Sequence, residues 1–136
     1  MTDVQRAAFA RLADALLPPV DGMPAPSSVD VGGRWLDRAL SARPDLEPAL
    51  AAALAQTSDD PLADARRLER DDPEAFAALG LLATGAYFMH PRVRKQIRYP
   101  GQKSVPAPDD EYDWWVREGL LDPVTARGSI WRSAPR

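Results

Sequence analysis

The sequence predicts an all-α fold, a compact bundle of about five helices around one central apolar helix, followed by an extended C-terminal tail rich in proline and aromatic residues. The first observation behind this prediction is that the chain has 14 prolines, and the stretches between them have the length of helices. Because proline is excluded from helix interiors, these prolines mark where helices begin and end. The second observation is that almost no stretch alternates with a period of two, so no sheet is expected.

The first helix is predicted at 1–17. Thr2 and Gln5 have the spacing of a capping box, in which the two side chains bind each other's backbone amides at the helix start. The residues expected on its buried face, which recur at helical spacing, are Val4, Ala8, Leu12 and Leu16. Pro18 and Pro19 end this helix.

A second helix is predicted at 27–43, with Ser27 or Ser28 as its N-terminal cap. Its buried stripe is expected to contain Gly32, Leu36, Ala39 and Leu40, with Trp35 beside it. The adjacent glycines Gly32 and Gly33 lower the helix propensity. We expect a close approach to a neighbouring backbone to be the compensation.

The remaining helices of the body are predicted at 49–60, 62–72 and 73–90. The buried residues of the first of these are expected to be Leu46, Leu50, Ala53 and Leu54. Asp60 and Asp72 each precede a proline, which is the pattern of an acidic cap followed by proline at the first helical position. The helix at 73–90 is apolar over its whole circumference, so it is expected to be buried all round and central.

The character of the chain changes after residue 98, and we divide one overall domain into a helical body at 1–98 and a tail at 99–136. Only one helix is predicted in the tail, at about 109–118, where Asp109 caps and Gly119 ends it. The tail also holds the aromatic residues Tyr99, Tyr112, Trp114, Trp115 and Trp131. Disordered segments are poor in aromatic residues. These rings are therefore expected to be buried, either on the chain's own helices or on a partner.

Composition excludes several classes of function. A net charge of −3 argues against nucleic acid as the main partner, and the chain has no cysteine and hence no thiolate site. The longest nearly apolar run, 75–89, is shorter than the ~20 residues of a membrane-spanning helix. No export signal is visible, so a cytoplasmic location is expected, with a periplasmic form that has lost its leader as the alternative.

No pattern in the sequence indicates catalysis. Phosphate-binding glycine loops, nucleophile–base pairs and nucleotide fingerprints are all missing from it, so the chain is not expected to be an enzyme by itself or to hold a cofactor or metal. His90 is the only histidine and has no neighbours at ligand spacing. Its place before Pro91 favours a structural role as the cap of a short helix, 91–97.

Charges of opposite sign are segregated after the central helix. The basic residues are Arg92, Arg94, Lys95, Arg98 and Lys103, and the acidic residues that follow them are Asp109, Asp110, Glu111 and Asp113. This pattern fits a solvated face, pairing between the two segments, or a surface that steers a partner. The adjacent Trp114 and Trp115 cannot share one helical face, so one of them can anchor an interface. A local fold-back that holds both rings is the alternative.

Three stretches together resemble a known family. They are Ala13-Asp14-Ala15-Leu16-Leu17-Pro18-Pro19 with the loop Val20-Asp21-Gly22-Met23-Pro24, then Tyr87-Phe88-x-His90-Pro91-x-Val93-Arg94, then Arg98-Tyr99-Pro100-Gly101. Their order and spacing are similar to those of the small subunit of gluconate 2-dehydrogenase (the subunit 3 family), over about 5–103. Family members often have glycine where Arg98 stands, and many begin with a twin-arginine signal, whereas this sequence begins directly at its first helix.

The resemblance implies a non-catalytic small subunit that stabilises, matures or escorts a large flavoprotein of the glucose–methanol–choline type, which acts on sugars and related alcohols. It implies that FAD belongs to the large subunit. The residues expected to bind this partner are Arg92, Arg94, Arg98, Tyr99, Trp114, Trp115 and Trp131. One rival is a self-contained helical scaffold without a flavoenzyme. Another is a small helical enzyme, which would need a closed polar pocket near His90, Tyr87 and 109–113.

Overall fold

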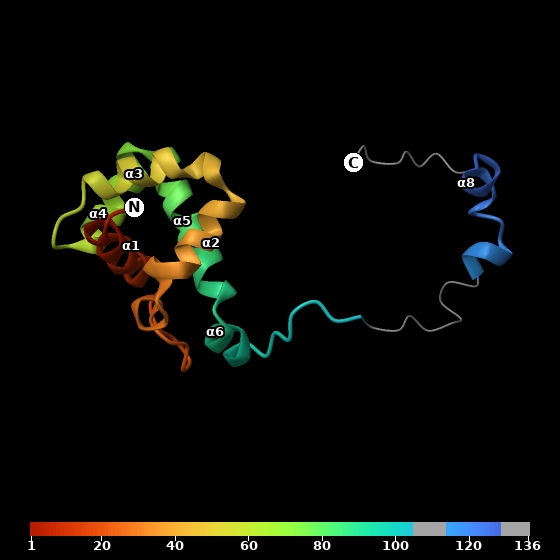
Figure 1. Cartoon of the computed structure of the whole chain (residues 1–136), viewed down its shortest axis with the longest axis horizontal. Coiled ribbons are helices and arrows are strands. Elements are labelled where there is room, and N and C mark those ends of the chain that lie inside the picture. Colours follow the sequence, from red (N-terminus) through yellow and green to blue (C-terminus); the bar gives the residue numbers. More distant parts are fainter. Residues whose placement is uncertain (105–113, 129–136) are drawn as a thin grey trace. The chain divides into compact units, whose positions relative to one another are not determined.

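A computed structural model describes residues 1–104 and 114–128, and in these residues every regular element is helical (Figure 1). The all-α prediction is therefore confirmed. The chain divides into two compact units, Met1–Gly101 and Gln102–Arg136. Each unit is described by itself below.

The first unit contains six α-helices and three single turns of other helical types among its described residues. In chain order they are α1 (Asp3–Leu16), η1 (Pro26–Val29), η2 (Val31–Trp35), α2 (Leu36–Ala42), η3 (Pro44–Leu46), α3 (Glu47–Ala55), α4 (Pro61–Asp71), α5 (Pro73–Met89) and α6 (Pro91–Gln96). In the described part of the second unit, residues 114–117 are helical and α8 spans Asp122–Ala126.

Local side-chain caps set the beginnings of four helices. The hydroxyl of Thr2 accepts a hydrogen bond from the amide of Gln5 at 3.3 Å, and Gln5 Oε1 accepts one from the amide of Thr2 at 2.9 Å. Asp60 caps α4 and Asp72 caps α5, each before a proline in the first turn. His90 caps α6 in the same way. The caps predicted at these four positions are confirmed because each depends only on residues two or three positions away.

The segment predicted as one helix at 27–43 is broken. Asp30 adopts the left-handed conformation (φ 54°), and Gly33 has φ −94° and ψ −130°, which are not helical values. The chain consequently forms η1, a single π-turn (η2) and then α2. Neither Ser27 nor Ser28 caps a helix, because the Ser28 hydroxyl instead donates to the carbonyl of Ala25 at 2.7 Å.

The close backbone approach expected at the glycine pair is present at Gly32. A Cβ atom placed there would lie 2.6 Å from the carbonyl oxygen of Arg6 on α1. Arg6 also ties α1 to this region through its guanidinium, which donates to the carbonyl of Gly32 at 2.9 Å and pairs with Asp37 at 2.7 Å. The buried stripe predicted here is confirmed, with Leu40 only partly buried.

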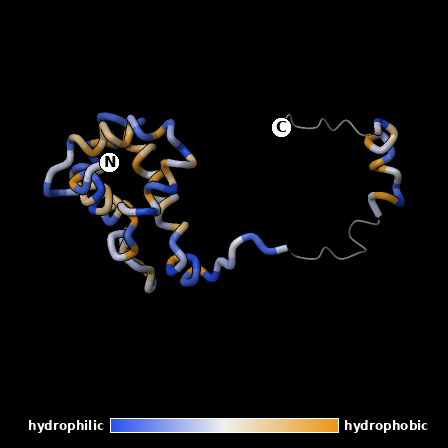
Figure 2. Tube along the Cα trace, viewed as in Figure 1, coloured by the Kyte–Doolittle hydropathy of each residue, from blue (hydrophilic) through white to orange (hydrophobic). Residues whose placement is uncertain are grey.

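Helix α5 is central, as predicted, and contacts α1, α2, α3, α4 and α6 (Figure 1). The largest fully buried side chains around it are Phe9, Leu12, Leu36, Leu50, Leu68, Leu79 and Leu82. Near its C-terminal end, the Tyr87 hydroxyl donates to the carbonyl of Pro24 at 2.7 Å and so fixes the proline-rich loop after α1. Figure 2 shows the apolar course of α5 and the more hydrophilic α6 that follows it.

Three expectations about burial and element content were wrong. Val4 on α1 is exposed, whereas Phe9 and Ala13 complete the buried face with Ala8 and Leu12. Helix α5 is not buried all round, because Leu81 and Phe88 are exposed. The tail holds a second helix, α8, that was not predicted. The predicted cap Asp109 lies outside the described residues, and Gly119 follows the helical turn at 114–117 with φ 67°.

Candidate functional site

The predicted site residues of the first unit lie on α6 and in the turn that follows it. Arg98 adopts a left-handed conformation (φ 55°) at the position where glycine is usual after a helix. The amide of Tyr99 donates to the carbonyl of Arg94 at 2.8 Å, and the amide of Arg98 donates to that of Lys95 at 3.1 Å. This pair of hydrogen bonds is the Schellman motif. The arginine in place of glycine therefore leaves the usual helix ending intact.

The side chain of Arg94 contacts other residues of this turn. Its guanidinium lies over the ring of Tyr99, 5.3 Å from the ring centre. Gly101, with φ 87°, lies beside the same guanidinium, and a Cβ atom at Gly101 would collide with it. Arg94 therefore orients Tyr99 and the end of the turn, and less of its charge faces outward than was expected of a free docking residue.

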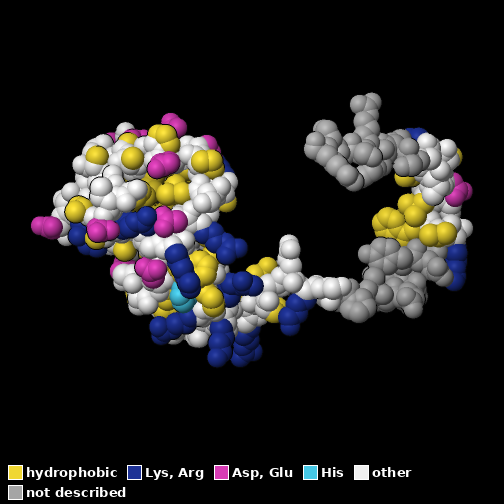
Figure 3. Space-filling model, viewed as in Figure 1, with side chains coloured by type: hydrophobic (Ala, Val, Ile, Leu, Met, Phe, Trp, Pro, Cys, Tyr) yellow, Lys and Arg dark blue, Asp and Glu magenta, His cyan; other side chains and the backbone are white. Residues whose placement is uncertain are grey.

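Three other cations near α6 are exposed. The side chains of Arg92, Lys95 and Arg98 make no hydrogen bond or ion pair with any other described residue. Elsewhere in this unit four arginines form ion pairs, namely Arg6–Asp37, Arg43–Asp45, Arg67–Asp64 and Arg70–Asp71, whereas α6 and the turn after it contain, within seven residues, three cations that pair with no described residue. Arg92, Lys95 and Arg98 have no acidic neighbour along the chain, because the sequence has no acidic residue between Glu74 and Asp109. Figure 3 shows this concentration of basic side chains around the histidine.

Apolar side chains are exposed among these cations. Ile97 and Tyr99 are both about half exposed, while Val93 on the opposite side of α6 is fully buried and anchors the helix. We refer to the exposed side chains together as the α6 surface, which consists of Arg92, Lys95, Ile97, Arg98 and Tyr99. The α6 surface combines unpaired positive charges with exposed apolar side chains. Such a surface is suited to a partner surface that is acidic around an apolar centre.

His90 has a structural role beside this surface. Its Nδ1 atom accepts a hydrogen bond from the amide of Arg92 at 3.1 Å, which confirms its prediction as a cap. The ring packs edge-on against Trp35, with centroids 5.4 Å apart. Burial lowers the pKa of His90, and the nearby positive charges of Arg34 and Arg92 lower it further. The imidazole is therefore neutral at neutral pH, as an acceptor at Nδ1 must be.

The other predicted site residues belong to the second unit. Trp114 and Trp115 are 49% and 48% exposed, and their ring centroids lie 5.4 Å apart with a tilt of 58°. The two rings therefore contact each other, which corrects the expectation that they point to different faces. Other exposed apolar side chains in this unit are Val116, Leu120, Leu121 and Val124. Trp131 and Tyr112 lie outside the described residues, as do the acidic residues at 109–113.

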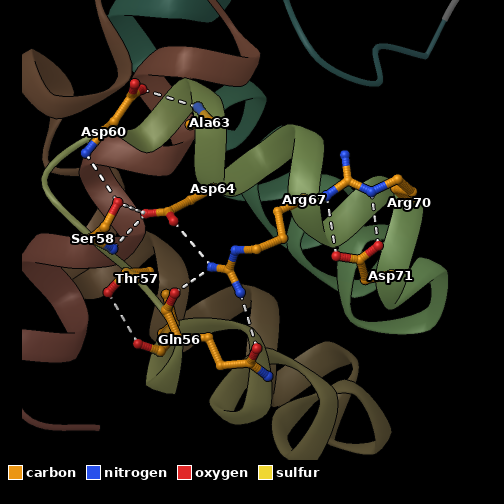
Figure 4. A network of polar contacts seen from close by, with 10 residues as sticks. Gln56, Thr57, Ser58, Asp60, Ala63, Asp64, Arg67, Arg70 and Asp71 are labelled. Atoms are coloured by element: carbon orange, nitrogen blue, oxygen red, sulfur yellow. Dashed lines mark hydrogen bonds and ion pairs between the residues drawn. The ribbon is translucent and has the colours of Figure 1, made fainter.

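A buried polar cluster between α3 and α4 was not predicted (Figure 4). Asp64 on α4 accepts hydrogen bonds from the amide of Ser58 at 2.6 Å and from Arg67 at 3.0 Å. Arg67 in turn binds both the side chain and the backbone carbonyl of Gln56. In sequence Asp64 looks like any acidic residue in a first helical turn, so only its neighbours in space show its role, which is to fix the α3–α4 loop.

The three stretches that carry the family resemblance meet at one end of the first unit (Figure 1). The loop after α1 is bound to α5 through Tyr87 and Pro24. The same loop touches α6, because a Cβ atom at Gly22 would lie 3.2 Å from the side-chain nitrogen of Gln96. The third stretch is the Schellman turn that closes α6. Residues as far apart in sequence as Gly22 and Gln96 therefore build one local structure, of which the α6 surface is the outer part.

Comparisons with protein-family models, curated proteins and solved structures found no match to this chain. The family resemblance therefore rests on the three stretches themselves. Within residues 1–104 and 114–128, no group of three or more histidine, aspartate or glutamate side chains is arranged to hold a metal ion. None of the helices described is both long enough and apolar enough to cross a membrane.

Proposed function

We propose that this chain is the non-catalytic small subunit of a heteromeric oxidoreductase. Its partner is a large FAD-dependent flavoprotein of the glucose–methanol–choline type that oxidises a sugar or related alcohol. The large subunit holds the FAD and performs the reaction, and this chain binds, stabilises or matures it. The complex is proposed to be cytoplasmic.

The main support for this proposal is that the three stretches that resemble the family lie together in space beside the α6 surface. Motifs that meet in space and present unpaired cations beside exposed apolar side chains are suited to binding another protein. Tyrosine and arginine are among the residues that contribute most to protein interfaces. Arg92 and Arg98, which have no partner among the described residues, are available to steer association with an acidic surface.

The tryptophan pair of the second unit supports the same proposal. A buried tryptophan removes roughly 150–250 Å² from water, whereas Trp114 and Trp115 are each about half exposed. Large rigid rings that remain exposed are the usual anchors of an interface. We therefore assign both units to the contact with the flavoprotein, the α6 surface through charge and the tail through its indole rings.

Co-expression tests this function directly. The chain is produced together with a candidate flavoprotein of this type, and the soluble yield, FAD content and specific activity of the flavoprotein are compared with and without the chain. The two are expected to copurify, and all three measures are expected to rise with the chain. The proposal fails if the flavoprotein is equally soluble, loaded and active alone and forms no complex.

Variants of the α6 surface and the tail identify the contacts. Arg92→Glu combined with Arg98→Glu is expected to slow association and reverse its salt dependence, since charges mainly control association rates. Trp114→Ala combined with Trp115→Ala is expected to weaken binding by about tenfold or more. Arg11→Glu is the matched control, because Arg11 is an exposed arginine on α1 whose side chain makes no ion pair or hydrogen bond with a described residue.

A further inference from the structure

One face of the central helix α5 is open. The residues Ala77, Leu81, Thr84 and Phe88 follow each other at helical spacing and are all exposed. The two large ones are 51% exposed at Leu81 and 41% exposed at Phe88. The helix has no charged residue after Glu74, so its outward face is uncharged for about three turns, or about 16 Å. An outward helix face is normally polar or charged, so this face needs a separate explanation.

Two glycines border this line of residues. A Cβ atom added at Gly80 or Gly85 would meet no other atom within 4 Å, and neither residue has a positive φ. Glycine in a helix interior is destabilising relative to alanine. At Gly32 the close approach of Arg6 accounts for the glycine, but no contact in the first unit accounts for Gly80 or Gly85. Both leave room for another backbone to approach α5.

We propose that this face binds a single amphipathic helix of the flavoprotein partner. We call it the α5 face, formed by Ala77, Gly80, Leu81, Thr84, Gly85 and Phe88. The bound helix is apolar where it lies on α5 and carries acidic residues at the end that lies toward α6. This inference rests on the proposed function and adds to it a second docking surface with a defined occupant.

The charges at the ends of the α5 face give the bound helix its chemistry. Glu74 lies at the N-terminal end of α5. At the other end α5 stops at Met89, and α6 begins two residues later with the cations Arg92 and Lys95. These cations have no acidic partner among the described residues. A helix with acidic residues at the α6 end would match this distribution, whereas a uniformly basic or uniformly acidic helix would not.

The shape of the α5 face favours a helix over a lipid surface. Gly80 and Gly85 flank Leu81 and Phe88 without side chains of their own, and open space lies over both glycines, so the side-chain rows of another helix can pack close to the α5 backbone. Helices that lie on membranes instead present large apolar side chains on their buried face. Glycines at both borders would add little to lipid binding, but they allow two helix backbones to come close.

Opposite effects on stability and binding test this inference. Gly80→Ala and Gly85→Ala are each expected to raise the denaturant midpoint of the isolated full chain and to weaken its affinity for the flavoprotein, by about tenfold for the pair. Leu81→Glu is expected to weaken this affinity at least as much. The matched control is Leu62→Glu, since Leu62 lies on α4 with a similar exposure of 47% and is expected to leave the affinity unchanged.

A photo-crosslinking residue at position 81 then identifies the occupant. In the purified complex it is expected to link to a helical segment of the flavoprotein, while the same residue at position 62 does not. The inference is overturned if Leu81→Glu and both glycine variants bind like the wild-type chain, although the proposed function survives if the complex still forms. It is also overturned if the crosslink joins two copies of this chain, or if only vesicle binding responds to Leu81→Glu. If the wild-type chain forms no complex, both proposals fail.

Discussion

Asp64 is the one charged residue buried in the described part of the chain, with 3% exposure. Burial would raise the pKa of its carboxyl group, but the hydrogen bonds from Ser58 and Arg67 outweigh this effect and hold the pKa below its ordinary value. The carboxylate is therefore ionised and fully bonded at neutral pH. Its removal would leave the amide of Ser58 without its acceptor in the α3–α4 loop, and Arg67 would keep only its two contacts with Gln56.

Asp64→Ala is expected to lower the free energy of unfolding by about 1–3 kcal/mol, because it removes the buried acceptor of the Ser58 amide and one partner of the partly exposed Arg67. Denaturant unfolding of the full chain measures this loss. Asp71→Ala removes an exposed ion pair from the same helix, and its cost is expected to stay below about 1 kcal/mol. Equal losses in the two variants would contradict the structural role assigned to Asp64.

His90 gives the fold a pH dependence that can be isolated. Its pKa is lower in the folded chain than in the unfolded one, so as the pH falls below the unfolded value of about 6.5 the unfolded chain takes up a proton first. The wild-type chain is therefore expected to lose stability between pH 7.5 and pH 5.5. His90→Asn keeps a capping side chain that does not titrate.

The denaturation midpoint of the wild-type chain is accordingly expected to fall more between these two pH values than that of His90→Asn. At pH 7.5 the midpoint of His90→Asn is expected to be somewhat lower, because the ring contact with Trp35 is lost, so the test compares the change in each midpoint between the two pH values. If both proteins respond equally to pH, other groups cause the effect and the neutral cap at His90 is not its source.

At the scale of elements, the break between η1 and α2 is held in place by α1. Gly32 permits α1 to approach, and the Arg6 guanidinium then donates to the carbonyls of Gly32 and Gly33 at the break, where the carbonyl of Gly33 also accepts from the amide of Leu36. The guanidinium of Arg6 also forms an ion pair with Asp37 on α2. A kink that costs regular helical hydrogen bonds is thereby stabilised by contacts to a different helix.

Gly32→Ala is expected to destabilise the chain by about 1–3 kcal/mol, since its new methyl group would meet the rigid carbonyl of Arg6. The same substitution at Gly80, where the space is open, is expected to act in the opposite direction. Circular dichroism followed through thermal unfolding compares the two. A stabilised Gly32→Ala chain would show that α1 does not approach the kink as described.

Across the described chain, the two units differ in how far their tryptophan rings are exposed to solvent. Trp35 in the first unit is buried, with the guanidinium of Arg34 over its ring. Trp114 and Trp115 in the second unit are half exposed, and their main described ring contact is with each other. Among the described residues, one indole is therefore protected by the fold and a pair is open to solvent.

Collisional quenching of tryptophan fluorescence by acrylamide measures this difference. The isolated chain is expected to show a strongly quenched fraction, and Trp114→Phe combined with Trp115→Phe is expected to remove much of it. Trp35→Phe is expected to leave the quenched fraction in place. If the wild-type emission is uniformly protected in a monomer, the indoles of the tail are sequestered by the chain itself and the tail does not need a partner.

The starts of α1, α4, α5 and α6 could be predicted because they depend on neighbours in sequence, whereas the break within 27–43 could not. Thr2, Asp60, Asp72 and His90 bind amides no more than three residues away, and a proline marks the first turn of three of these helices. The surroundings of the residues proposed to dock could be predicted only in part. The sequence shows that Arg92 and Arg98 lack acidic neighbours along the chain, but not that Arg94 turns inward onto Tyr99.

Proline spacing, local caps, hydrophobic pattern and charge therefore predicted the class of the fold, its central helix and a basic segment placed after it. Only the tertiary structure decided that one side of α5 remains open, that Asp64 is buried and that three distant stretches meet beside α6. The physical reason is the distance along the chain over which each interaction acts. Caps and helix periods arise from interactions within about one helical turn, whereas burial at Leu81 or Asp64 is set by helices that lie far away along the chain.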